Sequence, residues 1–87
     1  MKKLELGMVV TTPGAAEILR MDELAPLLAR HASGDWGIVP DDDWQENDLS
    51  VEHGWRVLSS YVVRDSRIWV LTEADRMTTT VLLPSEY

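Results

Sequence analysis

The sequence predicts an α+β protein: a single two-layer domain (residues 1–87) in which an antiparallel β-sheet packs against two or three helices on one face. Two patterns indicate this class. Helix-capping residues and apolar residues at helical spacing occupy the chain before Gly54, whereas apolar residues alternate with polar ones after it. A chain of 87 residues suits one domain with a small core.

The first segment, Leu4 to Val10, is apolar and rich enough in β-branched residues to form a strand. A short helix over Ala15 to Leu19 is expected to follow it. Thr12 can cap that helix, and Pro13 suits its first position because an N–H group has no partner there.

Two longer helices are expected next. One begins with Asp22 as its N-cap and ends at Ser33-Gly34, and we expect its His31 to lie at the helix end, where the charged ring interacts favourably with the dipole. The other runs from Asp41, where three carboxylates favour the N-terminus, to Gly54, which closes it. The apolar stripe of the first of these helices comprises Leu24, Leu27, Leu28 and His31.

Three strands in succession predict an antiparallel meander. They are Trp55 to Val63, Arg67 to Thr72 and Thr78 to Leu83, with turns at Arg64-Asp65-Ser66 and at Glu73 to Arg76. The first strand is expected to join the same sheet, because its backbone groups need partners. The core candidates are Leu24, Leu27, Leu28, Val57, Leu58, Trp69, Val70, Leu71 and Val81.

Acidic residues concentrate in one stretch, Asp22 to His53. It holds nine carboxylates against one arginine, Arg30, whereas the formal net charge of the whole chain is −7, so the other residues are nearly balanced. Because no Lys or Arg lies between Arg30 and Arg56, close neighbours in sequence cannot neutralise these carboxylates. They must face water, a metal or a basic partner.

The acidic stretch supplies the first group of candidate partner-binding residues. It is either a solvated helix face or a surface that imitates nucleic-acid phosphates and engages a basic protein groove. Like-charge pairs four residues apart, such as Asp42 with Glu46, weaken a helix and favour the second interpretation. The candidates in this group are Asp35, Asp41, Asp42, Asp43, Glu46, Asp48 and Glu52.

Trp36 and the turn from Glu73 to Arg76 supply the second group. Trp36 lies between two glycines, so its ring either fills the gap between helices and sheet or stands out as an interface anchor. In the turn, Asp75 can bond local backbone and Arg76 can pair with a nearby carboxylate, or Glu73, Asp75 and Arg76 can contact a partner.

Metal and catalytic sites are not expected. The run from Asp41 spaces oxygen ligands as a calcium loop does, but Glu46 stands where that loop requires glycine. His31 and His53 have no cysteine and no second histidine nearby to complete a zinc site. Ser59 and Ser60 lie in mid-strand, without the glycine-flanked turn that exposes a hydrolase serine. We therefore expect no cofactor and no enzymatic activity.

The expected location is the cytoplasm. The chain has no cysteine, which fits a reducing compartment. The basic start is interrupted by Glu5 and by the break at Thr11 to Gly14, so no export signal is predicted, and no stretch approaches the ~20 apolar residues of a membrane span.

Four blocks of the chain resemble, in the same order, small plasmid-related proteins carried by bacterial mobile elements. The blocks are Val9 to Ala15, Leu28 to Gly37, Trp69 to Arg76 and Thr79 to Tyr87. Some members of that group are labelled type I restriction methyltransferase subunits. This chain has neither the glycine-rich cofactor loop nor the Asn-Pro-Pro-aromatic turn that a methyltransferase needs. The resemblance therefore implies a mobile-element origin without an activity.

Together these observations favour an interaction protein. We expect it to bind a basic, nucleic-acid-handling surface of a host defence complex, a CRISPR effector or a restriction enzyme, and to inhibit it, because carboxylates compete with phosphate for basic grooves. Direct binding of nucleic acid is not expected, because carboxylates repel phosphate, and neither is a membrane partner. The alternative is a non-inhibitory plasmid maintenance or transfer protein that acts through homodimerisation.

Overall fold

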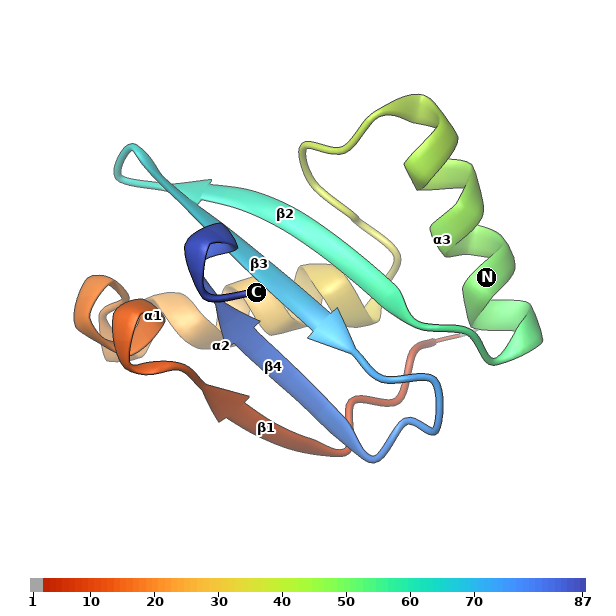
Figure 1. Cartoon of the computed structure of the whole chain (residues 1–87), viewed down its shortest axis with the longest axis horizontal. Helices are drawn as coiled ribbons and strands as arrows, with labels where there is room; N and C mark the ends of the chain where they lie inside the picture. The colour runs from red at the N-terminus through yellow and green to blue at the C-terminus, as the bar shows by residue number, and fades with distance from the viewer. Residues whose placement is uncertain (1–2) are drawn as a thin grey trace.

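The structure is a computed structural model that describes residues 3–87. Its elements, in chain order, are β1 (Met8–Thr11), α1 (Pro13–Ile18), α2 (Met21–Ala32), α3 (Asp41–His53), β2 (Val57–Val63), β3 (Ser66–Thr72), β4 (Thr78–Leu82) and the 3-10 turn η1 (Pro84–Glu86) (Figure 1). The predicted α+β class is confirmed, with one sheet formed by the first strand and the C-terminal meander.

The sheet has the strand order β1-β4-β3-β2. β2, β3 and β4 pair antiparallel, as predicted, but β1 pairs with β4 in parallel, so the sheet is mixed. The direction of β1 follows from what comes after it. The chain enters α1 at the end of the sheet where β4 runs into η1, and there the Glu86 carboxylate accepts hydrogen bonds from the Thr12 hydroxyl (2.5 Å) and the Gly14 N–H (3.0 Å).

The first strand begins at Met8 and ends at Thr11, whereas Leu4 to Val10 was predicted. Gly7 has a φ of +64°, and a Cβ at this position would lie 2.4 Å from the Met77 carbonyl oxygen, so the chain bends immediately before β1. Leu4 instead joins the core. Its side chain is buried, and its N–H donates to the Ala32 carbonyl at 3.0 Å.

Three of the four predicted helix caps are confirmed, and one of them is Ser33, the C-cap of α2. The Thr12 hydroxyl accepts the Ala15 N–H at 3.3 Å, and Gly54, at a φ of +76°, ends α3. The prediction of Asp22 as the N-cap of α2 is wrong. Arg20 is the N-cap, because the Glu23 carboxylate reaches back over the first turn and accepts the Arg20 N–H at 2.7 Å.

α1 and α2 cover one face of the sheet, and α3 lies beside the start of β2 (Figure 1). The core therefore forms in two parts. The main cluster, between α1, α2 and the sheet, consists of Ala15, Leu27, Tyr61, Ile68, Val70 and Val81. The second cluster, between α3, the N-terminal segment and the sheet, consists of Leu4, Trp36, Val51 and Val57.

Five of the nine core candidates are buried, and three of the nine, Leu58, Trp69 and Leu71, lie on the side of the sheet opposite α1 and α2. Leu58 and Trp69 are half-buried on the face that α1 and α2 do not cover, because Ile68 and Val70, the neighbours of Trp69, take the inward positions. In residues 3–87 no helix covers that face, and only η1 and Tyr87 lie over it (Figure 1). None of the helices in residues 3–87 is long and apolar enough to cross a membrane.

Candidate functional site

Five carboxylates on α3 form the acidic surface, the name used below for Asp41, Asp42, Asp43, Glu46 and Glu52. All five residues are exposed. The ion pairs in residues 3–87 are Arg30 with Asp35 and Arg64 with Glu23, so no Lys or Arg in this part of the chain pairs with the acidic surface. The negative charge that the sequence concentrates here therefore faces water.

Hydrogen bonds from both sides hold α3 in place. The Asn47 amide donates to the Leu58 carbonyl (2.8 Å) and accepts the Leu58 N–H (3.3 Å). One side chain therefore gives both backbone groups of Leu58, on the outer edge of β2, a hydrogen-bond partner. At the other end of α3, the Arg76 guanidinium donates to the carbonyls of Ser50 (2.8 Å) and Trp55 (2.7 Å). The acidic surface is therefore carried on a fixed support.

Asp48 and Trp36 belong to that support. The Trp36 ring is fully buried, and its Nε1–H donates to the Asp48 carboxylate at 2.9 Å. Of the two alternatives for Trp36, the structure shows the core position, so the ring cannot anchor an interface. Asp48 is half-buried by the same contact, so both residues hold α3 to the domain and neither is part of the acidic surface.

The remaining candidates also contact their own chain. Asp35 pairs with Arg30 (2.7 Å) and accepts the Gly37 N–H (3.1 Å); the hydrogen bond from Arg30 is the main reason that the pKa of Asp35 lies below its usual value. Asp75 accepts the Met77 N–H at 2.9 Å, as a turn residue does. Arg76 donates to backbone carbonyls, not to the carboxylate that was expected.

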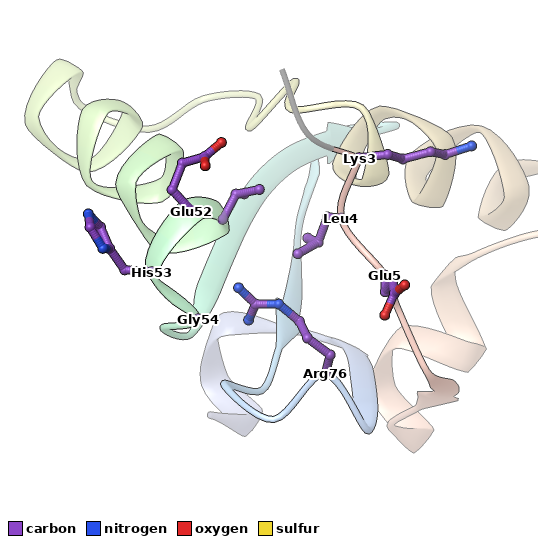
Figure 2. Close-up of a pocket in the computed structure, with 8 residues that line it drawn as sticks. Lys3, Leu4, Glu5, Glu52, His53, Gly54 and Arg76 are labelled. Carbon is purple, nitrogen blue, oxygen red and sulfur yellow. The ribbon is translucent and has the colours of Figure 1, made fainter.

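A cavity of about 360 Å³ lies where α3 ends. Glu52 and His53 line it from α3, Lys3 and Glu5 line it from the N-terminal segment, and Arg76 lies between them (Figure 2). Its charges are mixed, and the guanidinium of Arg76 already binds backbone carbonyls. Sequence analysis missed this site, because nothing local indicates that Leu4 and its neighbours return to the end of α3.

A second cavity, of about 230 Å³, connects the acidic surface to the uncovered face of the sheet. It combines two carboxylates with apolar side chains, and the Arg56 guanidinium lies 5.8 Å from the centroid of the Tyr87 ring at its border. The lining residues are Val39, Asp43, Glu46, Asn47, Arg56, Leu58 and Tyr87. This cavity can accept a cationic side chain whose aliphatic part packs on the apolar residues.

The buried His31 has a different role from the one predicted. Its ring is fully buried, with Nδ1 2.6 Å from the Ser59 hydroxyl and Nε2 2.8 Å from the Thr72 hydroxyl. Burial, and secondarily the charge of Arg76, lowers the pKa of His31 to about 4. The ring is therefore neutral at pH 7, and the expected favourable interaction of its charge with the helix dipole is wrong.

The proton positions along this chain of hydrogen bonds follow from its last member. The Thr79 hydroxyl donates to the Leu6 carbonyl (2.7 Å), so the Thr72 hydroxyl must donate to Thr79 (2.7 Å). Thr72 can then only accept from His31 Nε2–H, and Nδ1 accepts from Ser59. Ser59 and His31 are as close as a nucleophile and its base, but Ser59 is fully buried and substrate cannot reach it.

No three His, Cys, Asp or Glu side chains in residues 3–87 are grouped so that they could hold a metal ion. No protein-family model matches the sequence, and comparison with the curated proteins and with the solved structures finds no similar chain.

Proposed function

We propose that this protein is an acidic interaction protein from a mobile genetic element. It binds a basic, nucleic-acid-handling surface of a host defence complex, a CRISPR effector or a restriction enzyme, and inhibits that complex in the cytoplasm. The observation that carries the proposal is the acidic surface of α3, whose five exposed carboxylates have no Lys or Arg partner in residues 3–87. The mobile-element origin is implied by the resemblance of the four sequence blocks.

The density of charge along α3 supports competition with nucleic acid. Asp41 to Glu52 covers roughly 16 Å of helix axis at about 1.5 Å per residue, so the acidic surface carries about one carboxylate per 3–4 Å. One strand of B-DNA carries one phosphate per about 3.4 Å of axis. A groove lined with Lys and Arg for phosphate would therefore meet a similar linear charge density.

The fixed position of α3 supports binding without a large ordering penalty. Side chains of Asn47 and Arg76 hold the helix, and Gly54 ends it in the left-handed conformation that glycine adopts without strain. Binding then restricts the acidic side chains but does not have to fold the helix, which leaves more of the interaction energy available as affinity. Carboxylates placed in this way also steer association with a basic surface.

A binding role is supported over a catalytic one. The only Ser–His contact among the hydrogen bonds of residues 3–87, Ser59 with His31, lies in the core, and the second ring nitrogen of His31 binds a threonine instead of a carboxylate. The exposed apolar side chains of Met8 and Val62, on the two outer strands of the sheet, favour the second candidate function, a protein that acts through homodimerisation.

The proposal is tested with a variant that neutralises four of the five carboxylates of the acidic surface, Asp41→Asn/Asp42→Asn/Asp43→Asn/Glu46→Gln. Asp48 is left unchanged because it binds Trp36. Equilibrium binding to a purified RNA-guided CRISPR effector and to a purified type I restriction enzyme is measured over a range of salt concentrations. We expect the parent protein to bind one of them with an affinity that falls steeply as salt rises, and the variant to lose most of that affinity.

A matched control variant changes the same number of charges elsewhere. Its exposed carboxylates lie outside α3 and form no ion pair in residues 3–87: Glu5→Gln/Glu17→Gln/Asp22→Asn/Asp65→Asn. We expect it to bind nearly as tightly as the parent, and both variants to melt cooperatively. An equal loss of affinity in both variants would show that only the net charge of the protein matters. Unchanged binding by the α3 variant would show that the acidic surface is not the binding site.

A further inference from the structure

The two edges of the sheet differ in how they are protected. β2 forms one edge, and its own chain covers it. Asn47 binds both backbone groups of Leu58. Further along, the Ser60 N–H donates to the Trp36 carbonyl (3.0 Å) and the Ser60 carbonyl accepts the Ile38 N–H (2.6 Å). β1 forms the other edge, and in residues 3–87 no element lies along its outer side (Figure 1). An unprotected edge is a template for pairing with another chain.

Four backbone groups of β1 point away from the sheet. The Met8 N–H (2.9 Å) and the Thr12 N–H (3.0 Å) both donate to carbonyls of the neighbouring segment 77–81, so the even-numbered residues bond toward β4. Successive residues of a strand direct their backbone groups to opposite sides, so the odd-numbered residues bond the other way. The N–H and C=O groups of Val9 and Thr11 therefore face outward, where β4 cannot reach them.

The β1 edge also lacks the residues that keep exposed edges apart. Natural sheets protect such edges with lysine, other charged residues or proline on the strand. All four residues of β1 are exposed, and three of them are apolar, with exposed fractions of 69% for Met8, 36% for Val9 and 39% for Val10. Residues 6–16 contain no charged side chain, although the whole chain carries −7. This edge therefore suits an uncharged and largely apolar strand.

We propose that the occupant of this edge is β1 of a second copy of this chain, paired antiparallel around a two-fold axis at Val10. Val9 of each copy then lies opposite Thr11 of the other, and each such pair exchanges both of its hydrogen bonds. All the outward groups of both copies find partners, and the two sheets join into one. The inference specifies the homodimer of the second candidate function, on which it rests, and it uses no residue of the acidic surface.

The ends of β1 favour a second copy over an extended segment of another protein. Gly7 bends the chain before β1 at a φ of +64°, and Pro13 begins α1 and has no N–H to extend a ladder. The axis at Val10 places Gly7 of one copy opposite Pro13 of the other, so both strands stop at the same two points. On one side of the joined sheet Val10 meets Val10, which is a pair of β-branched side chains.

The distribution of charge is compatible with this dimer. α3, which carries the acidic surface, lies beside β2 at the opposite edge of the sheet (Figure 1). Pairing through β1 therefore places the two acidic surfaces at the far ends of the dimer, where their mutual repulsion is weakest and both remain free to bind a target.

A single cysteine tests the position of the axis, because the chain has none of its own. In the proposed dimer the two copies of Val10 form a non-hydrogen-bonded pair, whose Cα atoms lie about 4.5 Å apart, within reach of a disulfide. We expect Val10→Cys, oxidised with diamide, to form a linked dimer roughly tenfold faster or more than the control Met21→Cys. Met21 is 98% exposed on α2, away from β1. Equal rates of linkage in the two variants would overturn the proposal.

Sedimentation equilibrium of the purified chain tests the pairing itself. We expect the parent protein to dimerise, and salt not to weaken the dimer, because salt screens the repulsion between two chains of net charge −7. Val9→Pro removes an outward N–H and leaves the bonds to β4 intact, so it should weaken dimerisation roughly tenfold or more. The matched control Met21→Pro, at the first position of α2, should not.

A parent protein that stays monomeric up to about 1 mM, or a Val9→Pro variant as dimeric as the parent, would contradict the proposal. Both measurements use the chain alone, so they do not depend on the proposed target. Val9→Pro retains the whole acidic surface, so its binding to the CRISPR effector or the restriction enzyme tests the proposed function separately from dimerisation.

Discussion

Acidification is expected to destabilise this protein through one buried side chain, His31. In the unfolded chain His31 has the ordinary histidine pKa of 6.5, whereas burial lowers the pKa of His31 in the folded protein to about 4. Between these two pH values the unfolded state binds more protons, so the free energy of unfolding falls as the pH falls. The contribution of His31 is fully present above about pH 6.5 and is lost when the pH reaches about 4.

The difference of about 2.5 pKa values corresponds to roughly 3 kcal/mol of unfolding free energy, at about 1.4 kcal/mol each. That is a large share of the total for a domain of this size, which is expected to be about 4–13 kcal/mol. Three carboxylates also contribute to the acid sensitivity of the fold. The pKa values of Glu23, Asp35 and Glu86 are lowered by their hydrogen bonds, so their contributions are present near neutral pH and are lost under more acidic conditions.

The variant His31→Gln isolates the histidine. A glutamine amide can accept from Ser59 and donate to Thr72, as the neutral ring does, but it does not titrate. Urea unfolding is followed by tryptophan fluorescence at about pH 7 and about pH 4.5. We expect the variant to be less stable than the parent near pH 7 and to lose roughly 2–3 kcal/mol less than the parent on acidification. An equal loss in both proteins would refute this account of His31.

Substitutions at three further positions, Gly37, Gly54 and Asn47, test the contacts that hold the sheet and α3 in place. Gly37→Ala is expected to lower the free energy of unfolding by roughly 3 kcal/mol or more, because its Cβ would lie 2.1 Å from the Ser60 carbonyl oxygen. Gly54 has the same φ of +76°, but a Cβ there would meet no atom within 4 Å. Gly54→Ala should therefore lose only about 1–2 kcal/mol, measured by urea unfolding. Asn47→Leu leaves the Leu58 N–H and carbonyl without their partner, so its free energy of unfolding should fall by about 1–3 kcal/mol. Asn47→Asp retains an acceptor for the Leu58 N–H and should be intermediate. Equal stability of the parent and both Asn47 variants would contradict the role of Asn47.

Local patterns were sufficient to predict most of the secondary structure. Thr12 followed by Pro13 specifies a helix start, Gly54 specifies a helix end, and the alternation after Gly54 specifies strands, because each depends on groups within a few residues. The parallel pairing of β1 with β4, and the hydrogen bond between Thr12 and Glu86 beside it, join segments about seventy residues apart in sequence. Single-sequence patterns contain no such information.

The alternation of apolar and polar residues along a strand does not show which of its two faces packs against the core. It shows that Trp69 points away from Ile68 and Val70, but the size of Trp69 suggested that it faces the core, and the structure gives the inward positions to its smaller neighbours. For the candidate site, the sequence located the acidic surface of α3, because charge is a property of the residues themselves. It did not separate Asp48 from the free carboxylates, because the Trp36 ring that binds it is placed by long-range packing.

If the proposed function holds, the acidic surface of α3 occupies a site that a defence complex uses for nucleic acid. The most direct measurement is the dissociation constant of that complex for its DNA, titrated with the parent protein and with the variant Asp41→Asn/Asp42→Asn/Asp43→Asn/Glu46→Gln. The apparent dissociation constant is expected to rise linearly with the concentration of the parent protein and to stay constant with the variant. A complex that binds its DNA equally well at saturating parent protein, or equal inhibition by the variant, would contradict it.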